Sequence, residues 1–348
     1  MKRRFQVPAG IHFALLMAAA AIASVSGASA DTNAAPLFNS DSVIEIGLAG
    51  PFDSIIRDAE ERKRHPATLT VGERELDVKV RIRCNSRVRV CKFPPLRVYF
   101  GDDTAGTPFE DLKSLKLVTH CYDSDRGDRY LANEYAAYRS FGVLTPYSYR
   151  TRPLRVSYRD TAAEPVAEPV VRYAFFLESR PLLADRIGGE RVNVPAIRLG
   201  ELEQQQAATM FVFQYLIGNT DWSLVTSDND DKCCHNIDLV SQDGSIYTIP
   251  YDFDLSGLVN PPYAKPDQSL GISRVTMRRY RGYCIDGNHL RTALGHVRDQ
   301  RTAIIDELRQ IPIADTDQVD KMVKYLEAFF RKAEKDEKML ARFEKRCL

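Results

Sequence analysis

Acidic and amide side chains recur at three places in the segment LIGNTDWSLVTSDNDDKCCHNIDLVSQDGSIYTIPYDFDLSG, which covers residues 216–257. Asp221 follows one apolar run, Asn236 follows a polar loop, and Asp252 follows a second apolar run. Phosphoryl transfer needs a carboxylate that orients or deprotonates the acceptor hydroxyl group, and oxygen ligands that hold Mg²⁺ against nucleotide phosphates. The order Asp–Asn–Asp therefore predicts Asp221 as the catalytic carboxylate, and Asn236 and Asp252 as metal ligands.

These residues also have ordinary explanations when each is taken alone. A single Asp in a turn after a helix is common turn chemistry. The pair Asp252 and Asp254 is more specific, because it flanks Phe253 at the end of an apolar strand-like run. Acids in a protein core are costly unless a cationic group meets them. The pair therefore indicates a site that holds a cation.

A lysine and a glutamate upstream could complete such a site. SLKLVTHC alternates as a strand does and contains Lys116, and DRYLANEYAAYRSFG has helical spacing and contains Glu134. Protein kinases use a Lys on a strand and a Glu on the following helix as an ion pair at the nucleotide phosphates. We therefore expect Lys116 and Glu134 to pair, although either residue alone is also typical of a solvated face.

The elements that must position these residues change in type along the chain. Residues 42–180 are dominated by alternating, strand-like segments, whereas 181–348 contain a long apolar helix pattern, a hairpin that turns at Gly244, and terminal helix patterns. This order predicts an α+β fold with a β-rich N-lobe over 42–180 and a helical C-lobe with the catalytic loop over 181–348. Residues 31–41 are small and polar, and we expect a disordered linker there.

The first thirty residues have the pattern of a secretory signal peptide. A basic start is followed by the apolar run IHFALLMAAAAIASV and by ASA before Asp31. An uncleaved anchor is the alternative, but the run is short for a membrane span. We therefore expect a protein of the periplasm or the extracellular space, without a later membrane span.

Charge and length limit the class of this protein further. Cleavage after residue 30 lowers Lys plus Arg from 48 to 45 against 47 Asp plus Glu, which leaves a formal net charge of −2. Nucleic-acid binding normally needs an excess of positive charge, so we expect no nucleic-acid partner. The remaining chain of about 318 residues is long enough for two lobes, and we expect a monomer.

All seven cysteines lie in the part expected to be exported, where disulfides form readily. Cys84 and Cys91 flank the short stretch NSRVRV and are candidates for one bridge. The odd number leaves one thiol over, and Cys347 near the end of the chain is the candidate for it.

The segments quoted above resemble a known family. LIGNTDW, HN and YTIPYDFDLSG are similar to the core of the spore-coat CotH family, an atypical protein-kinase-like group with a Gly-Asn-x-Asp turn, a downstream Asn and an Asp-x-Asp. LDVKVRIRC, FPPLRVYF, LKLVTHC and VVRYAFFLES resemble its strand blocks. The resemblance runs from about Ser42 to about Cys284.

The resemblance implies a two-lobed atypical protein-kinase-like fold and ATP-dependent phosphorylation of proteins outside the cytoplasm, with Mg²⁺ or Mn²⁺. It implies that Lys116 contacts the nucleotide phosphates and that Glu134 orients it. It also implies that Glu178 lies at a hinge facing the adenine, through backbone groups, and that Asp254 is a rival or second metal ligand beside Asp252. The protein substrate is not identified.

The sequence departs from this family in several ways. Trp222 stands where many members have a basic residue, the loop before Asn236 is long, and no glycine-rich phosphate loop is present. ATP is also scarce in a bacterial periplasm. The alternative is therefore a catalytically inactive envelope protein used for adhesion or partner binding.

Two other motifs have alternative readings. The loop from Asp228 has the ligand types of a loose Ca²⁺ site. The arginines in SRVTMRRYRGYC suit either a solvated face or a dock for acidic groups.

Overall fold

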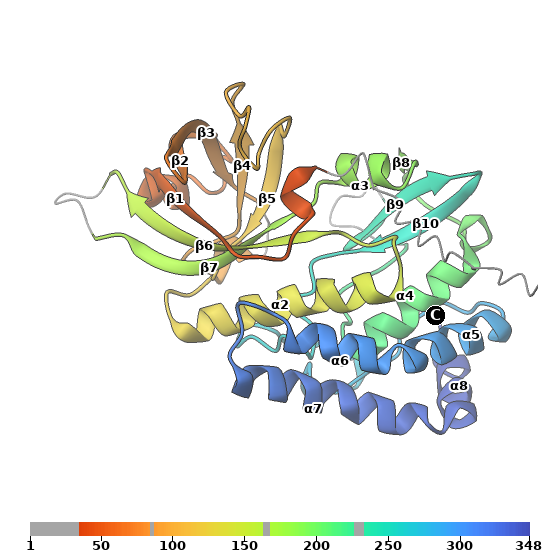
Figure 1. Ribbon diagram of the computed structural model, residues 1–348. Helices are drawn as coiled ribbons and strands as arrows, with labels where there is room; N and C mark the ends of the chain where they lie inside the picture. Colours follow the sequence, from red (N-terminus) through yellow and green to blue (C-terminus); the bar gives the residue numbers. More distant parts are fainter. Residues whose placement is uncertain (1–34, 84–86, 163–167, 226–232) are drawn as a thin grey trace, which may run out of the picture. The chain divides into compact units, whose positions relative to one another are not determined.

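Seven strands of the first half of the chain form a closed barrel (Figure 1). The computed structural model describes residues 35–83, 87–162, 168–225 and 233–348. Around the barrel, neighbouring strands follow the order β1-β2-β3-β4-β5-β7-β6. Their bounds are β1 Ile44–Gly50, β2 His65–Val71, β3 Arg74–Ile82, β4 Leu96–Phe100, β5 Ser114–Val118, β6 Thr151–Asp160 and β7 Val170–Leu177.

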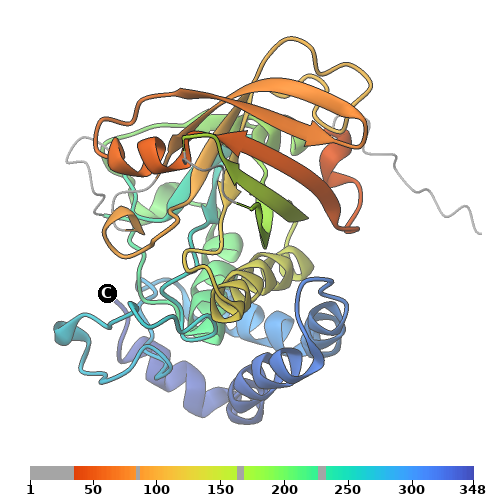
Figure 2. The same ribbon diagram turned by 90° about the vertical axis from the view of Figure 1, so that its left-hand side faces the viewer.

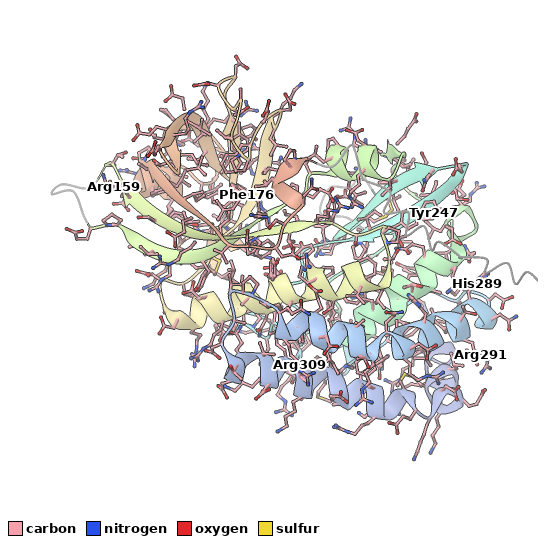
Figure 3. All side chains as sticks on the ribbon, in the orientation of Figure 1. Arg159, Phe176, Tyr247, His289, Arg291 and Arg309 are labelled. Atoms are coloured by element: carbon pink, nitrogen blue, oxygen red, sulfur yellow. A yellow bond between two sulfur atoms is a disulfide. The ribbon has the colours of Figure 1, made fainter. Side chains whose placement is uncertain are left out.

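Alternation of apolar and polar side chains explains why these segments form barrel strands. In β3, Leu76, Val78, Val80 and Ile82 are buried, and the residues between them face outward. Successive side chains of a strand point to opposite faces, so one face fills the barrel and the other carries the charged residues. Phe176 of β7, labelled in Figure 3, is fully buried in this interior core.

The barrel closes through a pairing between distant segments. β1 runs parallel to β6, with Glu45 opposite Arg155, and these two residues are 110 positions apart in the chain. The neighbouring pair β5 and β7 is antiparallel, with Lys116 opposite Leu177. Closure leaves neither β1 nor β6 as an open edge of the sheet.

Helix α2 lies between the barrel and the helices of the second half (Figures 1 and 2). It presents Leu131, Tyr135 and Phe141 to a second core that also contains Phe175 of the barrel and Phe213 of α4. The α-helices are α1 Phe52–Arg57, α2 Asp125–Leu144, α3 Arg180–Arg186, α4 Gln204–Ile217, α5 Gly287–Asp299, α6 Arg301–Arg309, α7 Thr316–Ala333 and α8 Asp336–Glu344. Short 3-10 helices are η1 Pro36–Phe38, η2 Arg87–Arg89, η3 Leu199–Glu201 and η4 Gln268–Leu270.

A second, three-stranded sheet has the order β10-β9-β8. Its strands are β8 Glu190–Val192, β9 Ile237–Gln242 and β10 Ser245–Pro250. The turn between β9 and β10 has positive φ at Asp243 (49°) and Gly244 (80°), and an Asp-Gly pair is favoured for such a two-residue hairpin turn. The hairpin predicted around Gly244 is therefore confirmed.

The predicted two-lobed atypical protein-kinase-like fold is wrong. The described residues form a closed seven-stranded barrel and eight α-helices, not a β-sheet N-lobe with a helical C-lobe, and they belong to one compact unit. Periodicity identifies strands but not their partners, so it does not reveal that β1 closes onto β6. It also does not reveal that α2, which precedes residue 180, shares its core with helices that follow it.

The disulfides differ from those expected. Cys91 bonds to Cys121, which lies 30 residues later, and Cys284 bonds to Cys347. Cys347 is therefore not the free thiol, and Cys91 is not paired with Cys84, which lies outside the described residues. Cys233 and Cys234 are bonded to each other. Short sequence separation predicted the wrong partner for Cys91 because the tertiary fold brings the segment before α2 beside it.

The N-terminal part of the chain is described from residue 35 onward. Residues 1–30, the predicted signal peptide, and 31–34 of the predicted linker lie outside the described residues. In the rest of that linker, Leu37 and Phe38 of η1 are buried against the barrel core. Among the helices in the described parts of the chain, none combines the length and the apolar character needed to cross a membrane.

Candidate functional site

Asp221 lies in a tight turn immediately after α4. The helix ends at Gly218, whose φ of 67° is the left-handed conformation that favours glycine. Asn219 then accepts a hydrogen bond from the backbone N–H of Asp221 (3.0 Å) and donates its own amide to Gln214 (3.0 Å). The turn therefore fixes where the Asp221 side chain begins.

Asp221 is held by the two residues that precede β9. The Asn236 side-chain amide donates to the Asp221 carbonyl oxygen (2.8 Å) and to its carboxylate Oδ2 (2.9 Å). The other carboxylate oxygen lies 3.1 Å from Nε2 of His235. The Asp221 side chain nevertheless remains 34% exposed. We call Asp221, His235 and Asn236 the Asp221 corner.

The hairpin brings Asp252 to the same place. The Tyr251 N–H donates to the Asn236 carbonyl oxygen (3.0 Å), so Asp252 follows directly after the residue that faces Asn236. Asp252 has a φ of 60°, and its backbone N–H donates to the Tyr138 hydroxyl group of α2 (2.8 Å). Asp221, Asn236 and Asp252 therefore converge at the end of the β9–β10 hairpin opposite its turn.

A buried arginine meets the acids that were proposed as metal ligands. Arg87 of η2 forms two parallel hydrogen bonds with Glu134 (3.0 and 3.1 Å). Its Nε lies 2.9 Å from Asp254, and it also forms an ion pair with Asp252. Tyr263 donates a further hydrogen bond to Asp254 (3.1 Å). We call Arg87, Glu134, Asp252 and Asp254 the Arg87 cluster.

Burial and mutual charge set the protonation of the Arg87 cluster. Burial, followed by the repulsion of Asp252 and Glu134, raises the pKa of Asp254 to about 7 against the attraction of Arg87. Burial also raises the pKa of Glu134, which Arg87 opposes. Burial acts in the same direction on Asp252, yet Arg87 and the other nearby cations hold its pKa below the ordinary value. Asp252 is therefore the acid of the cluster that most readily stays ionised.

Lys116 lies beside this cluster but does not pair with Glu134, whose ion-pair partner is Arg87. The Lys116 ammonium group stands 4.5 Å from the centre of the Tyr251 ring and 5.9 Å from that of Tyr149. Burial, together with the nearby Arg83, lowers its pKa to about 8. The expected Lys–Glu pair is replaced by an Arg–Glu pair, and Lys116 remains a cation near Asp252.

The side chain of Glu178 has a structural role. It accepts two hydrogen bonds from Arg186 of α3 (both 2.9 Å) and one from the backbone N–H of Arg150 (3.0 Å). It is almost fully buried. The side chain therefore links the end of β7 to α3 and to the start of β6. The backbone N–H of Glu178 donates to the Arg150 carbonyl oxygen (2.9 Å), so neither this N–H nor the side chain is left for the predicted hinge contact.

Other sequence motifs near the site are explained by packing. Arg278 donates to the carbonyl oxygen of Leu216 (2.9 Å) in the last turn of α4, and Arg281 donates to that of Thr220 (2.7 Å), next to Asp221. These two arginines therefore support the turn that carries Asp221. The residues of the loose Ca²⁺ motif between 228 and 232 lie outside the described residues.

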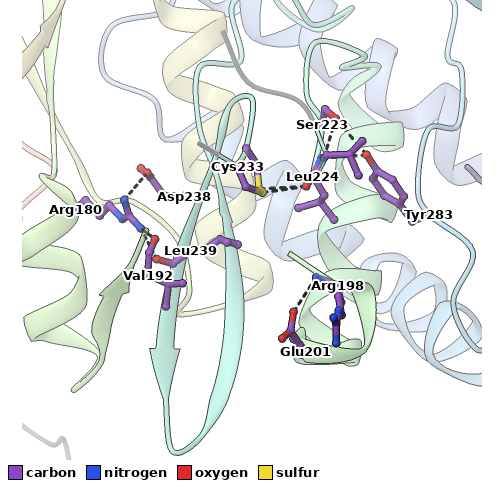
Figure 4. The surroundings of a disulfide bond; sticks show 12 residues. Arg180, Val192, Arg198, Glu201, Ser223, Leu224, Cys233, Asp238, Leu239 and Tyr283 are labelled. Atoms are coloured by element: carbon purple, nitrogen blue, oxygen red, sulfur yellow. Dashed lines mark hydrogen bonds and ion pairs between the residues drawn. A yellow bond between two sulfur atoms is a disulfide. The ribbon is translucent and has the colours of Figure 1, made fainter. Parts of the chain in front are cut away.

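Side chains of α3 and β9 interact near the Cys233–Cys234 disulfide (Figure 4). Arg180 lies 3.4 Å from the Asp238 carboxylate and donates to the Leu239 carbonyl oxygen (2.7 Å). The Cys233 sulfur lies 2.9 Å from the Leu224 carbonyl oxygen on the other side. His235 and Asn236 follow the bonded Cys233–Cys234 pair, so this pair helps to place the Asp221 corner.

Arg87 and His235 are the residues to which the sequence analysis assigned no role. Arg87 lies in NSRVRV, in the loop between two strands, where a basic residue is unremarkable. The signal that could have found it is the acid pair Asp252 and Asp254, because a buried pair of carboxylates requires a cation. The pattern indicated the requirement, and the tertiary structure supplies the residue.

Two side-chain oxygens of the site are of the type that a divalent cation prefers. Asp252 Oδ2 and Asn236 Oδ1 make no hydrogen bond to any described residue, and hard oxygens are the ligands that Mg²⁺ prefers. Within the described ranges, no group of three or more His, Cys, Asp or Glu side chains is arranged to hold a metal. Mg²⁺ commonly uses one or two protein ligands together with substrate phosphates and water, so a preformed cage is not required.

A scan against protein-family models found no match for this chain, and a search of curated proteins found none either. The resemblance to the CotH family therefore stays a prediction.

Proposed function

We propose that this protein transfers the γ-phosphoryl group of ATP to a hydroxyl group of a protein substrate outside the cytoplasm. The observation that supports this most is the convergence of Asp221, Asn236 and Asp252 at one end of the β9–β10 hairpin, beside Lys116. Phosphoryl transfer requires a positioned carboxylate, oxygen ligands for a cation and positive charge near the phosphates. This region contains a residue of the type needed for each requirement.

Asp221 is the proposed catalytic carboxylate. Its two oxygens are oriented by Asn236 and His235, while the side chain remains partly exposed to an incoming hydroxyl group. A carboxylate in this state can accept a hydrogen bond from the acceptor hydroxyl and take its proton as the new bond forms. Since Asp221 is fixed before the substrate arrives, little reorganisation is needed during the reaction.

Asp252 and Asn236 are the proposed ligands of Mg²⁺ or Mn²⁺, which would offset the charge of the β- and γ-phosphates when bound. Asp254 is not proposed as a ligand, because it is buried and engaged with Arg87 and Tyr263. Arg87 also reduces the negative charge of the site without a metal. Lys116 supplies a further cation close to Asp252.

The alternative is a catalytically inactive envelope protein that uses this surface for adhesion or partner binding. One observation favours it: Arg87 already provides Asp252, Asp254 and Glu134 with a cation, so these acids are satisfied without nucleotide or metal. The two functions differ in their response to ATP. An inactive binding protein needs neither ATP nor a metal.

The test is a titration of ATP against the purified protein, with and without Mg²⁺ or Mn²⁺. The free energy of unfolding is measured at each ATP concentration. A ligand at 100 times its Kd adds about 2.7 kcal/mol to the folded state. We expect stabilisation that depends on the metal, and incorporation of phosphate from ATP labelled at the γ position into an envelope-protein extract. No metal-dependent change at millimolar ATP would favour the inactive protein.

A further inference from the structure

The strands β3, β4 and β5 are neighbours in the barrel (Figure 1), and basic residues lie at facing positions on their outward side. Arg81 lies opposite Arg97, and Arg97 lies opposite Lys116. Arg83 follows Arg81 by two positions and its N–H still donates to the Pro95 carbonyl oxygen (2.9 Å), so it continues the same face. We call Arg81, Arg83, Arg97 and Lys116 the basic row.

Like charges in directly opposite positions destabilise a sheet. The outward charges on another part of the same barrel follow the opposite arrangement, since Glu45 of β1 lies opposite Arg155 of β6 and forms an ion pair with it at 3.3 Å. The basic row therefore costs stability in the free protein, and this cost would fall if an anion bound to it.

The cations of the row are partly buried and poorly satisfied. The Nε atoms of Arg81 and Arg83 are buried and have no hydrogen-bond partner among the described residues. Among the described residues, Arg97 donates a hydrogen bond to the Ser114 hydroxyl group (3.2 Å). Burial, and then the nearby Arg83 and Arg81, lower the pKa of Arg97 despite an opposing effect of Tyr99. The row is therefore a concentrated positive charge with unused hydrogen-bond donors.

The row ends at the candidate site. The Lys116 ammonium group contacts the ring of Tyr251, the residue before Asp252. Arg83 and Lys116 are also among the cations that act on the Asp252 carboxylate. Because neighbouring strands are about 4.8 Å apart, the positions from Arg81 to Lys116 span about 10 Å. An extended anion bound along the row would have one end beside Asp252.

We propose that the basic row binds a chain of phosphate groups, with the terminal phosphate nearest Lys116 and Asp252. Arginine suits this role because its planar group donates two parallel hydrogen bonds to phosphate oxygens. The row would replace the glycine-rich loop that this sequence lacks. Inorganic polyphosphate and the triphosphate of a nucleotide have the same phosphate chemistry. The inference rests on the proposed function only where it identifies the bound phosphates as those of a nucleotide.

The experiment measures the Kd of inorganic tripolyphosphate, ATP and adenosine by calorimetry, without divalent cations, so that metal ligands do not contribute. The variants are Arg97→Gln and Arg81→Gln, and the control is Arg155→Gln on the opposite-charge pair of the same barrel. A hydrogen bond to a charged group typically corresponds to about 10- to 100-fold in affinity. We expect tripolyphosphate and ATP to bind about 10- to 100-fold more weakly to both variants and normally to the control.

A second measurement separates binding from folding. Removal of Arg97 relieves repulsion, so the unfolding midpoint of free Arg97→Gln should equal or exceed that of the wild-type protein. A purely structural role for Arg97 would instead lower the midpoint. Weaker phosphate binding in a variant of equal or greater stability therefore identifies the row as a ligand site.

The outcomes distinguish this inference from the proposed function. Unchanged phosphate binding in both variants, or no tripolyphosphate binding by the wild-type protein, overturns the basic row as a phosphate site, and ATP-dependent protein labelling would then still support the function. Tripolyphosphate binding that the variants weaken, without any labelling of protein from ATP, supports the row and counts against the function. Competition between tripolyphosphate and ATP would support a shared site, whereas independent binding of the two would overturn it.

Discussion

Acidic side chains occur in two adjoining regions of the candidate site, and their surroundings differ. In the Asp221 corner, the carboxylate is 34% exposed and is met by an amide and an imidazole. In the Arg87 cluster, Glu134 and Asp254 are buried and a fully enclosed guanidinium group links them to Asp252. Asp252 belongs to this cluster, but 21% of its side chain remains exposed.

The difference indicates separate roles for similar residues. A carboxylate that is oriented yet accessible can exchange a proton with a substrate, whereas one locked against an arginine serves to hold neighbouring elements in place. Arg87 comes from the barrel loop, Glu134 from α2, and Asp252 and Asp254 from the segment after β10. The Arg87 cluster therefore joins three parts of the chain, and under the proposed function the Asp221 corner acts on the substrate while Asp252 also binds the metal.

The largest expected effects separate Asp221 from Asp252. Asp252→Asn should abolish metal-dependent ATP binding, because Mg²⁺ prefers an anionic oxygen to an amide. Asp221→Asn should leave ATP binding nearly intact but slow phosphoryl transfer by roughly 10²–10⁴-fold, the usual contribution of a positioned acid or base. Calorimetry with ATP and Mg²⁺, and transfer rates from labelled ATP, measure the two effects.

Asp243→Asn is the matched control for both substitutions. Asp243 is exposed at the other end of the same hairpin, and its left-handed backbone conformation also suits asparagine. The control should bind ATP and transfer phosphate at the wild-type level. Equal and small effects at Asp221 and Asp252 would contradict the division of roles and would leave both acids with structural roles only.

Loss of Arg87 is expected to lower the free energy of unfolding, and not only the rate of phosphoryl transfer. Arg87→Met leaves the buried carboxylates of Glu134 and Asp254, and the partly exposed one of Asp252, without their common cation. Breaking a buried ion pair in this way typically costs about 3–5 kcal/mol. Arg87→Lys keeps the charge but loses the two parallel bonds, so its cost should be smaller. Denaturant unfolding at pH 7 measures both.

Arg89→Met is the control, because Arg89 is exposed in the same short helix η2. It should change the free energy of unfolding by less than about 0.5 kcal/mol, as surface substitutions commonly do. If Arg87→Met were as mild as this control, the acids of the cluster would have to be satisfied by other groups, and the contrast between the two regions would fail.

The last expected effect concerns pH. The folded-state pKa of Asp254 is about 7, above its ordinary value of 3.8, so the folded protein binds more protons than the unfolded chain between these pH values. The contribution of Asp254 to stability is therefore present at low pH and is lost as the pH rises from about 4 through 7. The Asp254→Asn variant has no such group.

Denaturant unfolding of the wild-type protein and Asp254→Asn at several pH values between 4 and 8 tests this difference. The wild-type stability should fall relative to that of the variant as the pH rises. A wild-type curve that runs parallel to the Asp254→Asn curve would show that Asp254 is ionised throughout.

The sequence by itself identified features that depend on neighbouring residues. Period-two alternation identified β3, the Asp-Gly pair identified the turn of the β9–β10 hairpin, and this hairpin places Asn236 near Asp252. Gly218 and Asn219 marked the end of α4 and the turn that carries Asp221. These outcomes follow from local backbone preferences, which a short stretch of sequence contains.

Only the tertiary structure decided which distant segments meet. The closure of β1 onto β6, the bond between Cys91 and Cys121, and the partner of Glu134 each depend on contacts across the fold. The same pattern of apolar residues is compatible with many strand orders, and it does not indicate which of them has the lowest free energy. The acid pair at 252 and 254 indicated that a cation was needed, but several basic residues could have supplied it. The fold places Arg87 there, because η2 follows β3 and the Cys91–Cys121 bond ties the residues just after η2 to the segment before α2.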